Sequence, residues 1–335
     1  MINRCKIATV MLVLLSLLAM FFCGCESQQA ADAPASTSAS ASDSASVSDS
    51  DSASGHEESD LRRQTSFLFF SDTQASPETG DYSGFGEMLA TAVTKAENPD
   101  LVIFGGDTVN DGGDADEWRA FWEAAAQPLS GLVTAAIPGN HDNYPLLAKQ
   151  FDYPDKAPAG QGEGYFYSFD TGPVHFIMLD SNIMGAGNER DVEWLRNDLE
   201  SAQAQQSVWR IAVMHHPMWP VVDNPKDAAR AETMRELFLP LLADYGTDLI
   251  LCGHQHVYAR TLPMSGDTAA PDGVGIIQIM AASGSKEAYT AGAFEYISAS
   301  AGAPNYLCIT ADDDVLSVIA FNAGGEPFDV VTIMR

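Results

Sequence analysis

The chain has 335 residues, of which 46 are acidic and 17 basic, so its net charge is −29 when histidine is neutral. A chain of this length forms one large domain or two small ones. The negative charge repels other polyanions and no basic cluster opposes it, which excludes nucleic acid as a partner. Three of the five cysteines lie at positions 5, 23 and 25, which excludes a disulfide-based scaffold.

The N-terminal segment indicates export. Two basic residues precede an apolar run over residues 7–23, and Gly24 and Cys25 follow it. A membrane helix needs about 20 apolar residues, so the run is borderline for a span. A small residue directly before a cysteine resembles the cleavage site of bacterial lipoproteins, so we expect residues 1–25 to be a lipoprotein signal peptide with Cys25 lipidated. An uncleaved anchor and a secreted form are the alternatives.

Residues 26–60 have the composition of a flexible tether. The segment is rich in Ser, Ala and Asp, contains no Lys or Arg, and cannot form a core. A flexible chain of this length spans about 30 Å, enough to hold a domain clear of lipid headgroups. We therefore expect residues 61–335 to form the folded domain on the extracellular face of a bacterial cell membrane, or in the medium if the anchor is lost.

Apolar runs and helical patterns alternate in the folded part. Buried strands are predicted at residues 66–70, 101–104, 132–137, 208–214 and 249–252. Helices are expected around residues 192–199 and 234–242, and Pro240 should kink or restart the second. This alternation is typical of an α/β fold. The last third has strand patterns at 274–281, 306–310, 315–321 and 330–334 without helices between them, so we expect antiparallel closure of the sheets there.

Polar residues follow each of the five early strands. They occur in the segments Asp72 to Gln74, Gly106-Asp107, Gly139 to Asp142, His215-His216 and Gly253 to His256. Five of the seven histidines of the chain lie in these segments. Because ligands of open α/β sheets bind beyond the carboxyl ends of the strands, we expect these side chains to form one site.

The residue types in this set indicate catalytic metal binding. Carboxylate, amide and imidazole ligands without a thiolate suit Mn, Fe or Zn in a catalytic role better than a structural zinc. Two metals need a shared ligand, and Asp107 on a central strand is the expected bridge because a carboxylate has two oxygens. Paired ions about 3.5–4 Å apart can hold a hydroxide between them and neutralise a phosphoryl group. Taken singly, each segment could instead be a helix cap, a turn or a core histidine.

These motifs together resemble those of the calcineurin-like metallophosphoesterases. The matching segments are Asp72-Thr73-Gln74, Gly105-Gly106-Asp107, Gly139-Asn140-His141-Asp142, His215-His216-Pro217 and Gly253-His254-Gln255-His256. Residues 165–182 and 253–260 extend the resemblance to the purple acid phosphatase-like branch, and it covers residues 65–335. The resemblance implies an α/β fold, a four-layer sandwich of two mixed β-sheets flanked by helices, with the metal site at the C-terminal ends of strands.

The resemblance also implies a role for each residue. One metal would be held by Asp72, Asp107 and His256, and the other by Asp107, Asn140, His215 and His254. His141 would be the general acid, and the adjacent Asp142 would support its charge. His216 lies beside a predicted ligand and Arg260 follows the metal histidines, so both are candidate substrate contacts. His175, inside an apolar strand, is interpreted as structural.

The chain departs from the family pattern at two positions. Gln74 stands where many members have a metal-binding His, and it would ligate through its amide oxygen or through a water. Asn110 stands where purple acid phosphatases have a metal-binding Tyr, so we expect no tyrosinate colour. We also expect no sizeable N-terminal sandwich domain, because the tether runs directly into the first strand.

The leading hypothesis is a membrane-anchored hydrolase that cleaves small phosphoesters with a metal-bridging hydroxide and two Fe, Mn or Zn ions. A phosphomonoesterase is favoured over a phosphodiesterase or a nucleotide hydrolase. A non-catalytic surface binding protein on the same scaffold and a simple metal- or phosphate-binding lipoprotein are the alternatives, and the complete ligand set with His141 favours the enzyme. We expect no obligate protein partner. Substrate specificity is expected to reside in residues 143–164, 218–230 and 283–305.

Overall fold

The computed structural model describes residues 63–155, 166–184 and 189–335. The predicted signal peptide, Cys25 and the tether therefore lie outside the described residues. Among the residues that are described, no helix is long and apolar enough to cross a bilayer.

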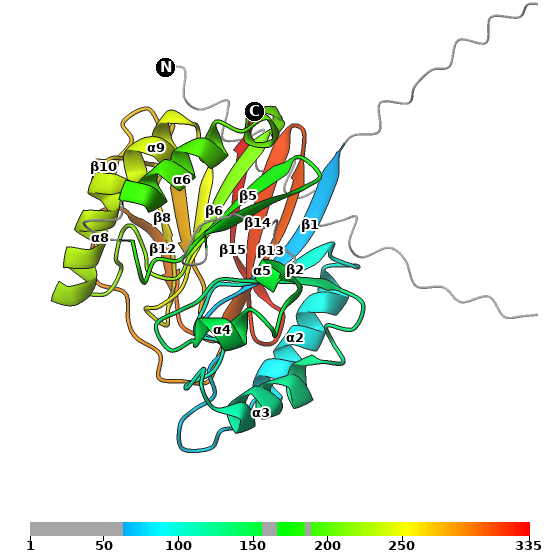
Figure 1. The fold of residues 1–335 in the computed structure, drawn as a ribbon. Coiled ribbons are helices and arrows are strands. Elements are labelled where there is room, and N and C mark those ends of the chain that lie inside the picture. The colour runs from blue at the N-terminus through cyan, green and yellow to red at the C-terminus, as the bar shows by residue number, and fades with distance from the viewer. Residues whose placement is uncertain (1–62, 156–165, 185–188) are drawn as a thin grey trace, which may run out of the picture. The chain divides into compact units, whose positions relative to one another are not determined.

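Two mixed sheets form the centre of the fold (Figure 1). The first contains, in order, β15 (Pro327–Met334), β14 (Val315–Asn322), β13 (Asn305–Asp312), β1 (Gln64–Phe70), β2 (Leu101–Phe104) and β3 (Val133–Ala136). The second contains β12 (Ile297–Ala301), β8 (Tyr258–Thr261), β11 (Ile277–Met280), β7 (Leu249–Cys252), β6 (Trp209–Met214), β5 (Val174–Leu179) and β4 (Tyr167–Thr171). A short hairpin joins β9 (Met264–Ser265) to β10 (Thr268–Ala269).

Helices cover the outer face of each sheet. On one side of the sheets in Figure 1 lie α2 (Ser83–Lys95) and α3 (Ala115–Ala125), and on the other lie α6 (Glu189–Leu199), α8 (Pro225–Leu237) and α9 (Leu239–Asp244). The shorter helices are α4 (Tyr144–Leu147), α5 (Asp152–Asp155) and α7 (Ala202–Gln206). The predicted break at Pro240 is confirmed, because α8 ends before it and α9 starts with it in its first turn.

The alternation of side chains along β1 shows how four layers arise from the sequence. Phe67 and Phe69 join the core between the sheets, where Phe67 meets Phe176 of β5 edge to face. Leu68 and Phe70 point to the opposite face and pack with the residues of α2 and α3. Each buried phenylalanine side chain contributes about 1.5–3 kcal/mol to folding. The predicted helix–sheet–sheet–helix sandwich is thus confirmed.

The pairing of the C-terminal strands matches the prediction only in part. Strands β13, β14 and β15 form the expected antiparallel array and close the first sheet against β1. Strand β11 meets the expectation in its antiparallel pairing with β8 but departs from it in its parallel pairing with β7. The chain passes from β7 to β8 and then to β11, and β8 pairs antiparallel with β11. Strand β11 therefore runs in the direction of β7 without a connecting helix.

His175 lies buried between two carboxylates. Its imidazole is 1 % exposed, with Nδ1 2.7 Å from Asp170 Oδ1 and Nε2 3.1 Å from Asp198 Oδ2. Burial opposes the charged form, but the two carboxylates outweigh it and raise the pKa of His175 to about 9. This placement fits the structural interpretation of His175.

We expect this charged cluster to stabilise the fold at low pH. Because the folded pKa lies above the unfolded value of about 6.5, the contribution is fully present below pH 6.5 and is lost as the pH rises through 9. Denaturant unfolding of metal-free protein should show a fall of about 3 kcal/mol in unfolding free energy over this window, and His175→Gln should remove it. An identical pH dependence in both proteins would contradict the assignment.

Candidate metal centre

The predicted ligands meet where the two sheets present the carboxyl ends of their parallel strands. Asp72 and Asp107 follow β1 and β2 of the first sheet, and His215 follows β6 of the second. One ligand atom from each of these three buried residues lies within 4.8 Å of the other two. Residues distant in sequence are therefore brought into one cluster that can hold a metal ion.

His254 and His256 reach the same cluster from the end of β7. His256 Nε2 lies 3.3 Å from Asp72 Oδ1. From the end of β6, His215 Nε2 lies 3.4 Å from Asp107 Oδ2. The backbone N–H of His254 donates to both oxygens of Asp72, at 3.0 and 2.8 Å. Asn140, predicted to complete the set, follows β3 and is exposed.

Outer hydrogen bonds set the orientation of each histidine ring. Carbonyl oxygens lie 2.9 Å from the Nδ1 atoms of His215 and His256, and they belong to Gly105 and Glu287 respectively. A carbonyl only accepts, so Nδ1 of each ring is the donor, and Nε2 faces the carboxylates of the cluster. His254 has the opposite arrangement, because Nε2 lies 3.1 Å from Asp227 Oδ1. Metal-binding histidines are oriented in this way.

Among the buried polar atoms without a hydrogen-bond partner in the described residues, two belong to predicted ligands. They are His215 Nε2 and Gln74 Oε1. An unpaired buried polar atom costs about 1–3 kcal/mol, so such atoms indicate a missing ligand. Both atoms are suitable donors to a metal ion, and the donor set therefore fits the metals that the sequence predicts.

The backbone is strained at four of the predicted ligands. The angle φ is positive at Asp72 (50°), Asp107 (52°), His254 (74°) and His256 (40°). In the described part of the chain, only Glu97 and Asn98 are further non-glycine residues of this kind. Left-handed conformations cost about 1–2 kcal/mol each and persist at functional sites because the surroundings enforce them.

Two glycines leave room for the carboxylates. A Cβ atom on Gly139 would lie 2.1 Å from Asp107 Oδ1, and one on Gly253 would lie 2.2 Å from Asp72 Oδ2. Neither position tolerates a side chain without displacing the carboxylate beside it. The glycines of these two motifs are therefore part of the site.

The electrostatics keep the central carboxylate ionised. Burial opposes the charge of Asp107, but His215 and the backbone N–H of His141 hold its pKa well below the usual range. The Asp142 carboxylate accepts from the backbone N–H groups of Asp107, Thr108 and Gly139 at 2.7, 3.2 and 2.8 Å. Asp142 thus braces the two metal-binding loops, which is a positioning role rather than the direct support of His141 that the sequence suggested.

The comparison with known families agrees with this geometry. The sequence profile described as "Calcineurin-like phosphoesterase" matches residues 65–258, more than half of the chain.

The chain belongs to the calcineurin-like phosphoesterase family.

Relatives within the family include purple acid phosphatases. Purple acid phosphatase 15 of Arabidopsis thaliana is 29 % identical over 154 residues, which cover 44 % of this chain and 28 % of the relative. A probable glycerophosphodiester phosphodiesterase of Arcobacter nitrofigilis is 31 % identical over 169 residues, which cover 49 % of this chain and 59 % of the relative. The chain thus spans less than two thirds of these relatives.

Solved structures confirm the fold of the family. A purple acid phosphatase from yellow lupin seeds superimposes with a TM-score of 0.67 at 20 % identity, covering 81 % of this chain and 54 % of that one. GAP50, titled the anchor in the inner membrane complex of Plasmodium, gives a TM-score of 0.61 at 16 % identity, covering 81 % and 89 %.

The two candidate substrate contacts lie in other surroundings. His216 is 3 % exposed, its Nδ1 is 2.9 Å from Ser181 Oγ, and its ring centroid lies 4.2 Å from that of His254. Arg260 donates to both oxygens of Asp329 at 2.7 and 3.0 Å. His216 therefore packs behind a predicted ligand, and Arg260 is committed to an ion pair with β15, so neither substrate contact has structural support.

The structure adds residues that sequence reasoning missed. Asp227 of α8 accepts from Gln255 Nε2 at 2.6 Å as well as facing His254, and Lys286 Nζ lies 3.1 Å from His141 Nε2. No local pattern marks either residue, since each contact joins segments far apart in the chain. The sequence indicated them only through their segments, because Asp227 lies in 218–230 and Lys286 in 283–305, both predicted to carry substrate specificity.

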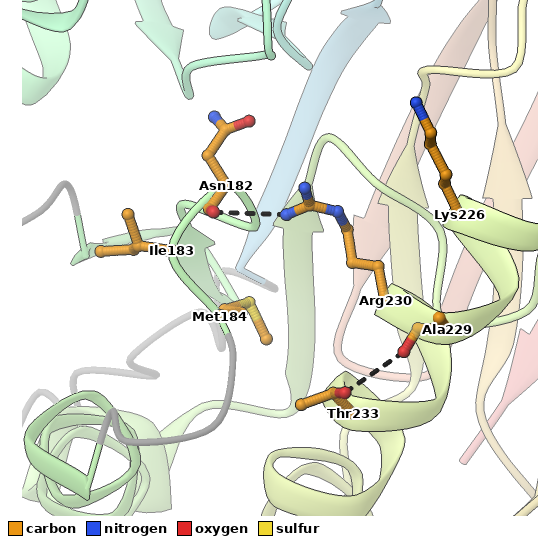
Figure 2. A pocket seen from close by; sticks show the side chains of 7 residues that line it. All are labelled: Asn182, Ile183, Met184, Lys226, Ala229, Arg230 and Thr233. Atoms are coloured by element: carbon orange, nitrogen blue, oxygen red, sulfur yellow. Dashed lines mark hydrogen bonds between the residues drawn. The ribbon is translucent and has the colours of Figure 1, made fainter.

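A pocket of about 340 Å³ lies along α8 (Figure 2). Lys226 and Arg230 line one side, and Asn182 and Met184 line the other. Arg230 Nη1 donates to the carbonyl oxygens of Ser181 and Asn182 at 2.9 and 3.2 Å. Asp227 on the same helix faces His254, so α8 links the pocket to the metal-binding loops.

Proposed function

We propose that the protein is a hydrolase of small phosphoesters that works with two metal ions. The observation that carries the proposal is the buried meeting of Asp72, Asp107 and His215, in which His215 Nε2 faces the bridging candidate Asp107. The profile match over residues 65–258 shows the family, while the activity and the substrate are our proposal. The same fold occurs in a protein titled an anchor, so the ligand set rather than the fold favours catalysis.

The ligand roles follow the division that the sequence predicts. Asp72, Asp107 and His256 would hold one ion, and Asp107, Asn140, His215 and His254 the other. When bound, such ions lower the pKa of water and neutralise charge on a phosphoryl group. Gln74 is a further candidate, because its unpaired Oε1 is buried in the same region.

His141 is the proposed proton donor to the leaving group. Its backbone N–H donates to Asp107 Oδ1 at 2.8 Å, and its ring Nδ1 lies 2.7 Å from the carbonyl oxygen of Asn110. These bonds hold the imidazole beside the bridging carboxylate while the side chain stays exposed to substrate. A phosphate monoester is the preferred substrate class, and the names of the relatives leave a diester or a nucleotide as the alternative.

Metal removal and substrate comparison test this proposal. The full chain, purified in detergent, should lose phosphoester hydrolysis after chelation and regain it with Fe, Mn or Zn. The panel should contain alkyl and aryl monoesters, a diester and a nucleotide. A protein that binds two metals per chain yet hydrolyses none of these esters would support the non-catalytic alternative.

We also propose that the domain is anchored to the outer face of the membrane through Cys25. The support is the sequence alone, in the apolar run before Gly24-Cys25 and the tether after it. Cys25→Ser should abolish membrane retention or leave the precursor unprocessed. Cys23→Ser, the control, should be processed and retained on the membrane normally. Normal processing and retention of the Cys25 variant would contradict lipid attachment at this residue.

A further inference from the structure

Lys286 contacts the proposed proton donor, His141. Its Nζ atom lies 3.1 Å from His141 Nε2, although 145 residues separate the two in sequence. An ammonium group only donates, so Nε2 is the acceptor, and Nδ1 of the same ring faces Asn110 O at 2.7 Å. The contact places a positive charge directly beside His141.

The loop that carries Lys286 is bonded to the metal-binding segments on both sides of the lysine. Before it, the backbone N–H groups of Gly284 and Ser285 donate to the carbonyl oxygens of Asp72 and Gln74 at 2.8 and 3.0 Å. After it, the Glu287 carbonyl lies 2.9 Å from His256 Nδ1, and the Tyr289 N–H donates to His256 O at 3.2 Å. Lys286 is therefore held in place by the same loops that carry predicted ligands.

Close packing adds to this constraint. A Cβ atom on Gly284 would lie 2.2 Å from Gln74 O and 2.5 Å from Asp72 O. The Tyr289 ring stacks on His256 with centroids 5.4 Å apart. The loop thus touches the metal centre through backbone and ring contacts, and its geometry is coupled to the ligands.

The charge of Lys286 is not neutralised in the described part of the chain. Its ammonium group pairs with no carboxylate there, although the whole chain carries a net charge of −29. Arg230 of α8, by contrast, donates to two backbone carbonyl oxygens. A half-buried ammonium whose partner is an imidazole nitrogen is available to an anion.

We propose that Lys286 binds a phosphoryl oxygen of the substrate and favours phosphate monoesters over diesters. This inference rests on the proposed function and specifies its substrate class. An anionic oxygen is a stronger acceptor for an ammonium than a neutral imidazole, so the substrate takes over the bond that His141 now accepts. This frees Nε2, which must carry a proton when His141 acts as the acid. A monoester presents close to two negative charges at neutral pH and a diester only one, so the extra cation favours the monoester.

The test compares three variants of the full metal-loaded chain. Lys286→Met should lower kcat/KM for phenyl phosphate, and the affinity for inorganic phosphate measured by calorimetry, by about 10- to 100-fold. The affinity for bis(p-nitrophenyl) phosphate, as substrate or as competitive inhibitor, should change less than about threefold. Lys286→Arg should recover most of the loss. Lys95→Met, which removes an exposed charge over the Phe321 ring, is the matched control and should behave as the wild type.

Metal content is measured in each variant and should stay at two ions per chain. Equal losses on monoester and diester, or loss of metal in both Lys286 variants, would show a merely structural role and overturn the inference. Unchanged phosphate affinity in Lys286→Met would overturn it as well. If one of these contrary results is found while the wild type still hydrolyses esters, the proposed function stands without the inference. A wild type that binds two metals but hydrolyses no ester would overturn both the proposed function and the inference.

Discussion

Replacing Asp107 by Asn should reduce the bound metal from two ions per chain to one or none and lower kcat/KM by about 10³-fold or more. The loss corresponds to about 4 kcal/mol of transition-state stabilisation, the scale expected for paired metal ions. An amide has only one good metal-binding oxygen. If that oxygen keeps the hydrogen bond from the His141 N–H, the NH₂ group replaces the Asp107 oxygen that faces His215 Nε2 at 3.4 Å.

Metal analysis after gel filtration, together with phenyl phosphate hydrolysis, measures both effects. Asp111→Asn is the matched control, because in the described residues this exposed carboxylate accepts only from the Gly113 N–H, at 2.9 Å. This variant should keep two ions and full activity. An Asp107 variant with two tightly bound ions and wild-type turnover would show that the bridge assignment is wrong.

His141→Ala should separate proton donation from metal binding. The side chain is exposed, and its ring hydrogen bonds among the described residues join it to Asn110 O and Lys286 Nζ, so the variant should keep both ions. A well-placed general acid contributes about 10²- to 10⁴-fold, but only where the leaving group needs the proton. Hydrolysis of an alkyl phosphate should therefore fall by about this factor, while an aryl phosphate with a stable phenolate should be much less impaired.

Pre-steady-state kinetics on both substrates must show that chemistry limits the rate. If the two losses are then equal and the metal content is intact, the acid role is refuted and His141 acts in phosphate binding instead. Lys286→Met differs from this pattern, because it should weaken phosphate affinity whatever the leaving group.

The strands and the location of the site could be predicted because they depend on local patterns. Phe67 to Phe70 identify β1 as a strand buried on both faces, and the polar residues after each early strand mark the edge where parallel strands end. The resemblance then named the ligand set, and the structure brings Asp72, Asp107 and His215 together. The role of each residue as a ligand remains a prediction.

The remainder depends on contacts between distant segments. The parallel pairing of β11 with β7 follows from the placement of β8 between β11 and β12, which no local pattern reveals. Arg260 follows the metal histidines in sequence, yet its partner Asp329 belongs to the last strand. Lys286 reaches His141 only because its loop is bonded to the segments after β1 and β7.

The central claim is a two-metal centre that shares Asp107, and anomalous diffraction from crystals of the manganese-loaded protein tests it most directly. We predict two anomalous peaks about 3.5–4 Å apart, with one Asp107 oxygen beside each, Asp72 and His256 on one ion, and Asn140, His215 and His254 on the other. A single peak at full metal occupancy, or two peaks that Asp107 does not join, would contradict the account.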